Sequence, residues 1–353
     1  MAEKFLMKGN EALAEAAIRS GCRHFFGYPI TPQTEVAAYM AKRMPKIGGT
    51  YLQAESEIAA INMVLGCAST GARAMTSSSS PGISLKGEGI SYIIGSDLPC
   101  LIVNVMRGGP GLGGIQPSQA DYWQATKAPG HGDGQVLVFA PSSVQEIVDM
   151  VAKAYDLAET YRMPAMLLAD GMLGQMMEPV VFPEVEPVQH DKSWALSGTK
   201  GKRKPNIVNS LYLQPKELED TVKARFARYA VVQEKETMIE EYKMEDAEYA
   251  VCAYGAMARV VKSAVTAARE KGIKVGLLRP ITLWPFPTKQ IAAYGGKVKS
   301  MLCVEMSMGQ MVEDVRLAVN GACPVGFFGR TGGIIPSPAE VLAEIEKMVG
   351  GAN

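Results

Sequence analysis

The sequence predicts an α/β fold in which a doubly wound parallel sheet is followed by a second, smaller α/β domain. From residue 9 to about residue 181, short apolar strands alternate with helical segments. Strands that are apolar on both faces and separated by helices are typical of a parallel sheet covered on each side. A shorter block from residue 246 onward repeats this alternation. Between the two blocks, the chain is rich in Pro, Lys, Glu and Arg and lacks strong periodicity, which indicates a long excursion.

The pattern divides the chain into three parts: a first domain at residues 1–185, a charged linker at 186–245 and a second domain at 246–353. A chain of 353 residues is long enough for two domains of ordinary size, each with its own core.

In the first domain, strands are predicted where short apolar runs are bounded by Gly, Pro or polar residues. The expected strands are 24–27, 51–53, 74–76, 101–105, 136–139 and 165–169. Helices are predicted where apolar and small residues recur at helical spacing. The expected helices are 10–20, 33–43, 55–69, 82–95 and 142–161. Thr31 or Thr34 is expected to cap the helix that begins near Glu35.

The linker is expected to contain one charged helix, at residues 216–244. In the second domain, the expected strands are 249–254, 274–278, 301–305 and 325–328. Helices are expected after Gly255, Gly309 and Pro338.

Four successive strand ends of the first domain carry polar or charged residues that can bind a ligand or take part in catalysis. Thr31 follows the first strand, Glu57 the second, a run of hydroxyl residues at 76–80 the third, and Arg107 the fourth. In a parallel α/β sheet, the carboxyl ends of the strands line one crevice where ligands bind. The sequence therefore predicts a ligand site at this end of the sheet.

Each of these residues also has a purely structural interpretation. An acid at a helix start is favoured by the helix dipole, and Glu55 is an alternative to Glu57 as the carboxylate of the site. Arg107 precedes the glycine-rich loop 108–114 and could simply hold it in place. That loop fits neither common nucleotide-binding motif. Residues 305–310 could contact a ligand or cap the helix that follows them.

Composition excludes several classes of function. Lys plus Arg equals Asp plus Glu at 36 each, so nothing indicates a nucleic-acid or polybasic membrane surface. No apolar run approaches the roughly 20 residues that span a bilayer, and the N-terminus lacks a secretory signal, so a cytoplasmic location is expected. The six cysteines form no C-x-x-C motif, and the three histidines share no helical spacing. No metal or iron–sulfur site is therefore expected within this chain.

Several motifs resemble the pyrimidine-binding half of the 2-oxoacid:ferredoxin oxidoreductases, a family that uses thiamine diphosphate. The motifs are the loop 28–32, the helix start 55–57, the turn 79–82, the strand end 104–109 and, in the second domain, 279–287 and 305–310. The resemblance covers nearly the whole chain. Its length and the segment 116–121 look closest to the pyrimidine-domain subunit of 2-ketoisovalerate (3-methyl-2-oxobutanoate) enzymes. The resemblance implies a pyrimidine-binding domain followed by a transketolase-C-terminal-like domain.

The resemblance also implies roles for individual residues. Glu57 matches the carboxylate that bonds N1′ of the aminopyrimidine ring, where burial would raise its pKa into a useful range. Thr31 and Arg107 match substrate-binding positions, and an arginine suits a carboxylate because it binds it in a bidentate manner. Pro29, Ile30 and Ser80 match cofactor-binding positions.

The tripeptide Gly132-Asp133-Gly134 imitates the start of the diphosphate and magnesium motif of thiamine enzymes, but no asparagine follows at the required distance. We therefore interpret it as a turn. The resemblance then implies that a β-type partner subunit supplies Mg²⁺ and the diphosphate site. It also implies a γ-type subunit, and a ferredoxin-like subunit that carries the iron–sulfur clusters.

The resulting hypothesis is a catalytic subunit that converts a 2-oxoacid and coenzyme A to acyl-CoA, CO₂ and reduced ferredoxin. The resemblance implies a branched-chain substrate, and the loops 28–35 and 108–120 agree with it because they contain no Lys, Arg or His to pair a second carboxylate. The alternatives are a member specific for pyruvate or 2-oxoglutarate, half of a split, non-redox thiamine-dependent decarboxylase or transketolase-like enzyme, and a non-catalytic subunit.

Overall fold

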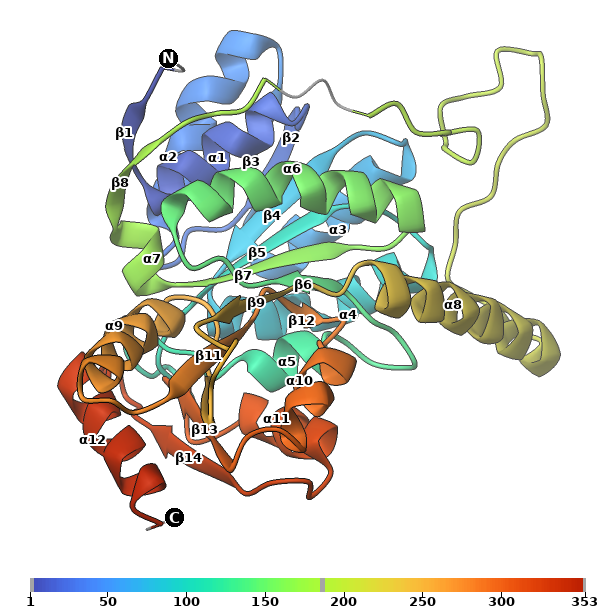
Figure 1. Ribbon diagram of the computed structural model, residues 1–353. Helices are drawn as coiled ribbons and strands as arrows, with labels where there is room; N and C mark the ends of the chain where they lie inside the picture. Colours follow the sequence, from blue (N-terminus) through green and yellow to red (C-terminus); the bar gives the residue numbers. More distant parts are fainter. Residues whose placement is uncertain (1–2, 185–187, 352–353) are drawn as a thin grey trace.

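The computed structural model describes residues 3–184 and 188–351, which form two large sheets and a separate two-stranded one (Figure 1). The larger sheet has seven strands in the order β12-β6-β7-β5-β4-β2-β3, of which β12 (Thr282–Trp284) comes from the C-terminal part of the chain. Six of its strands run parallel: β2 (His24–Gly27), β3 (Thr50–Gln53), β4 (Ala74–Ser78), β5 (Leu101–Met106), β6 (Leu137–Phe139) and β7 (Ala165–Asp170). These short, buried runs were predicted from the sequence, most of them to within two residues.

Helices cover both faces of this sheet. One group packs together from α1 (Gly9–Arg19), α2 (Thr34–Arg43) and α6 (Val144–Tyr161), and a second group consists of α3 (Glu57–Ser69) and α4 (Ser80–Gly95). The two groups lie on opposite faces (Figure 1). This follows from the strand order, because the chain moves outward from β2 to β3 and then returns past β2 to β4. The strand order therefore reverses between β2 and β4.

Smaller elements complete the first unit. β1 (Phe5–Lys8) and β8 (Met177–Val180) form a separate antiparallel pair. A 3₁₀ helix, η1 (Met44–Ile47), follows α2, and two short helices, α5 (Tyr122–Thr126) and α7 (Gly171–Gln175), follow β5 and β7.

The second sheet has the order β14-β13-β10-β11-β9. Its strands are β9 (Ile239–Tyr242), β10 (Tyr249–Cys252), β11 (Val275–Pro280), β13 (Ser300–Glu305) and β14 (Val325–Gly329). The helices α9 (Met257–Glu270) and α12 (Pro338–Val349) pack together, as do α10 (Thr288–Gly295) and α11 (Met311–Val319).

The charged helix of the linker, α8 (Pro215–Lys235), is shorter than predicted. The sequence pattern predicted a helix that extends to residue 244, but residues 239–242 form β9, which pairs antiparallel with β11. Met238 and Ile239 pack against the core, and this packing overrides the helical tendency of the charged residues around them. α8 is fixed to the first unit by Arg225, whose guanidinium donates to Asp97 at 3.0 Å.

A short strand from the C-terminal part of the chain joins the first sheet. β12 (Thr282–Trp284) pairs antiparallel with β6. Gln119 adds a second link, because its side chain donates to the Tyr254 carbonyl at 2.9 Å and accepts from the Met306 amide at 3.0 Å. The C-terminal part of the chain is therefore joined to the first sheet by β12 and by buried hydrogen bonds.

None of the helices within the described ranges combines the length and apolar character needed to cross a bilayer.

Candidate functional site

The four predicted strand-end residues meet at the carboxyl end of the seven-stranded sheet. Thr31 lies in the loop after β2, Glu57 begins α3 after β3, Ser80 begins α4 after β4, and Arg107 follows β5. The strand order reverses between β2 and β4, where a crevice for ligands is expected in an open α/β sheet.

Glu57 is the buried carboxylate of this site. It is the first residue of α3, and its residue is 6% exposed, whereas Glu55 is exposed. Ser56 fixes the helix start because its hydroxyl accepts from the Ala59 amide at 3.1 Å. The geometry therefore favours Glu57 over Glu55 as the carboxylate that faces inward.

Gly82 provides the space that the Glu57 side chain occupies. A Cβ atom on Gly82 would lie 2.8 Å from Glu57 Oε1 and 2.1 Å from Ser78 Oγ. The carboxylate and the hydroxyl thus converge on a backbone position that tolerates no side chain.

Three buried hydroxyls near the end of β4 lack a hydrogen-bond partner. They belong to Thr76, Ser78 and Ser79, and none of them is bonded within the part of the chain that the structure describes. Buried polar groups are nearly always paired, so an unpaired group calls for an explanation such as a ligand. Unpaired hydroxyls beside a buried carboxylate indicate a polar ligand at this position.

Arg107 is buried and joins two loops of the site. Its guanidinium donates to the carbonyl of Thr31 at 3.0 Å and to the carbonyl of Leu112 at 3.1 Å. These contacts agree with the interpretation in which Arg107 holds the glycine-rich loop. Its Nε has no partner within residues 3–184 and 188–351, so the guanidinium retains a free donor.

The Ser80 hydroxyl is used within the chain. It donates to Asp121 at 2.6 Å and accepts from the Arg107 amide at 3.0 Å. Asn104 also donates to Asp121, at 2.9 Å. Burial raises the pKa of Asp121, and the hydrogen bonds from Ser80 and Asn104 oppose this rise. This network sets the end of β5 and the start of α4 relative to each other.

The loop after β2 faces outward at the predicted positions. Pro29 and Thr31 are exposed and Ile30 is half-buried. The N-cap of α2 is Gln33, without a side-chain capping bond, and not Thr31 or Thr34 as predicted. Gln33 instead accepts from the Ser77 hydroxyl at 2.5 Å, which ties the loop to β4.

The segment 305–310 serves as a helix cap. The buried Glu305 carboxylate accepts from the amides of Gln310, Met311 and Val312 at 2.9–3.1 Å. Of the two interpretations left open by the sequence, the capping role is the one these contacts support.

Sequence reasoning missed three residues that shape the site: Gln33, Asp121 and Lys86. Gln33 and Asp121 act through tertiary contacts that local patterns do not reveal. Lys86 carried a signal, because it is a lone cation in an apolar stretch of α4, four residues after Gly82.

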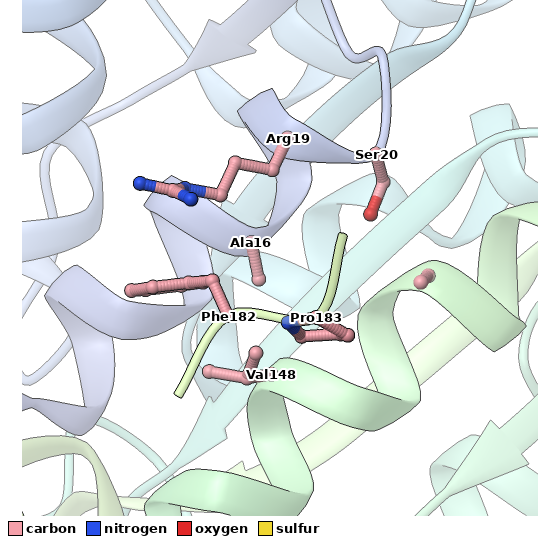
Figure 2. A pocket seen from close by; sticks show the side chains of 7 residues that line it. Ala16, Arg19, Ser20, Val148, Phe182 and Pro183 are labelled. Carbon is pink, nitrogen blue, oxygen red and sulfur yellow. The ribbon is translucent and has the colours of Figure 1, made fainter. Parts of the chain in front are cut away.

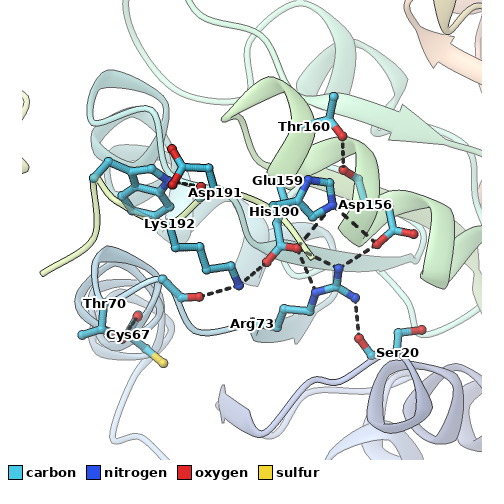
Figure 3. A network of polar contacts seen from close by, with 12 residues as sticks. Ser20, Cys67, Thr70, Arg73, Asp156, Glu159, Thr160, His190, Asp191 and Lys192 are labelled. Atoms are coloured by element: carbon cyan, nitrogen blue, oxygen red, sulfur yellow. Dashed lines mark hydrogen bonds and ion pairs between the residues drawn. The ribbon is translucent and has the colours of Figure 1, made fainter. Parts of the chain in front are cut away.

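Two other features lie toward the amino end of the sheet. A small cavity of about 20 Å³ is lined by residues that include Ala16, Arg19 and Phe182, and it has room for about one water molecule (Figure 2). Asp156, Glu159 and His190 are grouped closely enough to hold a metal ion. However, the Arg73 guanidinium donates to both carboxylates, at 2.6 Å and 2.7 Å (Figure 3). Its positive charge therefore occupies the position that a metal ion would take.

Comparisons with known proteins agree with this architecture. Residues 15–251 match a family described as pyruvate flavodoxin/ferredoxin oxidoreductase, thiamine diphosphate-binding. Residues 247–341 match core domain II of pyruvate:ferredoxin oxidoreductase.

Two curated relatives match the chain over almost its full length. The ketoisovalerate oxidoreductase subunit VorB of Methanothermobacter marburgensis is 48% identical, and the match covers 99% of each chain. The 2-oxoglutarate synthase subunit KorA of Methanothermobacter thermautotrophicus is 35% identical, and the match covers 99% of this chain and 100% of that one.

A solved structure is also similar. It is the 2-oxoglutarate:ferredoxin oxidoreductase from Magnetococcus marinus with 2-oxoglutarate, coenzyme A and succinyl-CoA bound. The TM-score is 0.88 at 27% identity, and the match covers 99% of this chain and 66% of that chain.

Proposed function

The chain belongs to the thiamine diphosphate-binding pyruvate flavodoxin/ferredoxin oxidoreductase family, and on that premise we propose that it is the pyrimidine-binding catalytic subunit of a branched-chain 2-oxoacid:ferredoxin oxidoreductase. The reaction is the oxidative decarboxylation of a substrate such as 3-methyl-2-oxobutanoate with coenzyme A. The family resemblance and the fold class predicted from the sequence are confirmed. Relatives named as oxidoreductase subunits favour this function over a split enzyme without a redox step.

The observation that carries the proposal is the buried Glu57 carboxylate opposite Gly82, beside a Ser78 hydroxyl that has no partner among the described residues. These groups fit an aminopyrimidine ring, because a carboxylate and hydroxyls can pair with its ring nitrogens and amino group. When bound, thiamine diphosphate supplies the carbon nucleophile that attacks the 2-oxo group. Glu57 holds and moves the proton at N1′ of the ring.

Pro29, Ile30 and Ser80 are the remaining cofactor-binding positions that we propose. Pro29 and Ile30 lie in the loop after β2, on one side of the reversal in strand order, and can contact the ring from there. Ser80 acts through its network with Asp121 and Arg107, because its own hydroxyl is already used.

We propose Thr31 and Arg107 as substrate-binding residues. The guanidinium already bridges the Thr31 carbonyl and the glycine-rich loop. Its Nε has no partner in the described part of the chain and is a donor for the substrate carboxylate. The apolar residues nearby suit a branched aliphatic chain; they are Ile30, Met106, Leu112 and Ile115. A dicarboxylate would need a second cation, since burying an unpaired charge costs several kcal/mol.

A partner chain is proposed to cover the face formed by α3 and α4. Both helices are apolar, yet Ile58 and Leu85 are each 51% exposed on them and Tyr92 is 37% exposed. A helix that is apolar on every side is normally buried, and an exposed apolar patch marks an interaction site. Leu112 and Ile115, at 85% and 56% exposure, continue the apolar rim around the site.

This partner is proposed to be the β-type subunit that supplies Mg²⁺ and the diphosphate site. The γ-type subunit and the ferredoxin-like subunit with the iron–sulfur clusters complete the proposed complex, and a cytoplasmic location remains part of the prediction. The proposed complex includes no nucleic acid.

The test starts with the purified chain and then adds the co-expressed partner subunits. The chain alone should be colourless and should bind thiamine diphosphate weakly, and the complex should reduce ferredoxin with 3-methyl-2-oxobutanoate and coenzyme A. Tight magnesium-dependent binding by the chain alone would contradict the shared site.

Substrate preference is tested separately, by comparing kcat/KM of the complex for 3-methyl-2-oxobutanoate, pyruvate and 2-oxoglutarate. We expect the branched substrate to be preferred. A clear preference for 2-oxoglutarate would show that a partner chain supplies the second cation, and the proposed substrate would be wrong.

A further inference from the structure

Lys86 is a fully buried lysine next to the candidate catalytic carboxylate. Its residue is 0% exposed, and it is one of the largest fully buried side chains described in the protein. Its ammonium donates to the backbone carbonyl of Glu57 at 3.3 Å, and this is the one hydrogen bond it makes among the described residues.

Stability does not explain a lysine in this position. An ammonium group has three donors, and burying it with a single carbonyl partner is unfavourable. The carbonyl of Glu57 also gains little, because a carbonyl in the first turn of a helix already accepts a bond within that helix. A buried ionisable group that lacks a structural reason is a candidate for a functional role.

The position of Lys86 relative to Gly82 explains what it contacts. The two residues are four apart on α4 and therefore share one face of the helix. This face meets the first turn of α3. Gly82 lies against the Glu57 carboxylate, and Lys86 lies against the Glu57 carbonyl.

We infer that Lys86 is a positioning residue for Glu57. Its ammonium fixes the first turn of α3, which aims the carboxylate, and its positive charge interacts with the negative charge of Glu57. The inference rests on the proposed function of Glu57 and adds to it a residue on a different helix.

The charge of Lys86 is adjustable near neutral pH. Burial lowers the pKa of Lys86 to about 8, and the negative charge of Glu57 opposes this shift. Glu57 is the charged group that acts on Lys86 in the described part of the chain. Below about pH 8 the ammonium supports the Glu57 carboxylate, and above it this support is lost.

The first experiment measures exchange of the thiazolium C2 proton in the reconstituted complex from pH 6 to 10. Lys86→Met preserves approximate volume and removes the charge, and we expect about tenfold slower exchange at pH 7, a part of the roughly 10²–10⁴-fold that acid–base groups contribute. The wild type should show a change in rate near pH 8 that the variant lacks. Lys86→Arg, which stays charged, should retain most of the rate at pH 7 and also lack the change near pH 8. Lys42→Met, an exposed lysine on α2, is the control.

The second experiment measures thermal unfolding of the chain and needs no activity. Because the folded-state pKa of Lys86 is lowered, the unfolded chain binds more protons between about pH 8 and 10.5, so wild-type stability should rise over this range. Lys86→Met should unfold at the same or a higher temperature than the wild type at pH 7, and its advantage should shrink by pH 10.

The decisive comparison combines Lys86→Met with Glu57→Gln. If Lys86 acts through Glu57, Lys86→Met should slow exchange in the wild type and have no further effect in the Glu57→Gln background. An equal loss in both backgrounds would overturn the inference, as would a lower unfolding temperature that parallels the loss of exchange. The complex could show no oxidoreductase activity while the unfolding data still show the pH dependence. The proposed function would then be wrong, but the link between protonation of Lys86 and folding stability would stand.

Discussion

Buried charged side chains at the two ends of the seven-stranded sheet differ in how fully they are paired. Toward the amino end, Arg73 is paired with Asp156 and Glu159, and Lys192 donates to Glu159 at 2.7 Å (Figure 3). At the carboxyl end, Lys86 has one backbone acceptor. Three hydroxyls there have no partner within residues 3–184 and 188–351. Among the described residues, the buried arginine at the amino end is held in ion pairs, whereas the buried lysine and the hydroxyls at the carboxyl end have one partner or none.

The difference shows in the pKa values. Burial would raise the pKa of Glu159, but the hydrogen bonds from Arg73 and Lys192 outweigh it and the pKa is lowered. At the carboxyl end, burial dominates, since it lowers the pKa of Lys86 and raises that of Asp121. Paired groups stabilise the fold, whereas unpaired groups are retained where a ligand completes them.

The strongest test of the contrast is Glu57→Gln. It should leave the unfolding temperature nearly unchanged and slow C2 proton exchange in the complex by about 10²–10⁴-fold, because it removes the proton relay. Glu55→Gln, two residues away and exposed, is the matched control and should behave like the wild type. If Glu55→Gln loses exchange and Glu57→Gln keeps it, the assignment is reversed.

Arg73→Ala should show the opposite profile. Removing one partner of a buried ion pair leaves the other charges uncompensated, so the free energy of unfolding should fall by about 3–5 kcal/mol. Urea unfolding of the chain measures this, with Lys42→Ala as the exposed control. Unchanged stability would mean that the Arg73 network does not hold the fold together.

Arg107→Ala should damage substrate recognition and spare cofactor activation. Losing one partner of a buried charged pair costs roughly 2–5 kcal/mol, which predicts a fall in kcat/KM of at least tenfold. Exchange of the C2 proton without substrate should stay near normal. A collapse of exchange with intact substrate affinity would instead assign Arg107 to holding the glycine-rich loop.

Gly82→Ala tests the space around Glu57. The added Cβ would meet Ser78 Oγ and Glu57 Oε1 at 2.1 and 2.8 Å, so the free energy of unfolding should fall by about 1–3 kcal/mol. Gly87, on the same helix, has open space around it, and Gly87→Ala should instead stabilise the chain by about 0.5–1 kcal/mol. Equal effects would show that the space at Gly82 is not special.

The smallest expected effect is on folding stability at low pH. The folded-state pKa of Glu159 is lowered, so its stabilising contribution is present above its ordinary value of 4.5 and is lost as the pH falls through the folded value. Between pH 5 and 3, the wild type should lose more stability than Glu159→Gln. Parallel loss in both would assign the acid sensitivity to other carboxylates.

The sequence predicted the first sheet well because its strands are short, apolar on both faces and bounded by clear turn residues, as in 24–27 and 101–105. It also placed Thr31, Glu57 and Arg107 at one end of that sheet, since parallel strands place their ends together. Roles in binding and catalysis remain predictions for these residues.

The errors share one physical cause. β8, β9 and β12 form through tertiary pairing that a local pattern cannot show. Lys86 was overlooked because its importance depends on complete burial against another helix. Hydrophobic periodicity reports which residues face the core, but not which polar residue is enclosed there.

The three residues of β12 limit how the chain can be divided. Cleavage after residue 245 by a protease, or separation into two genes at that point, would remove the strand that covers β6 and leave that edge of the sheet bare. Bare sheet edges promote aggregation. A fragment ending at residue 245 should therefore precipitate when expressed alone, and a fragment that supplies residues 282–284 in trans should restore its solubility. Evolution could exchange the C-terminal part of this chain only if the replacement also supplied a strand to cover β6.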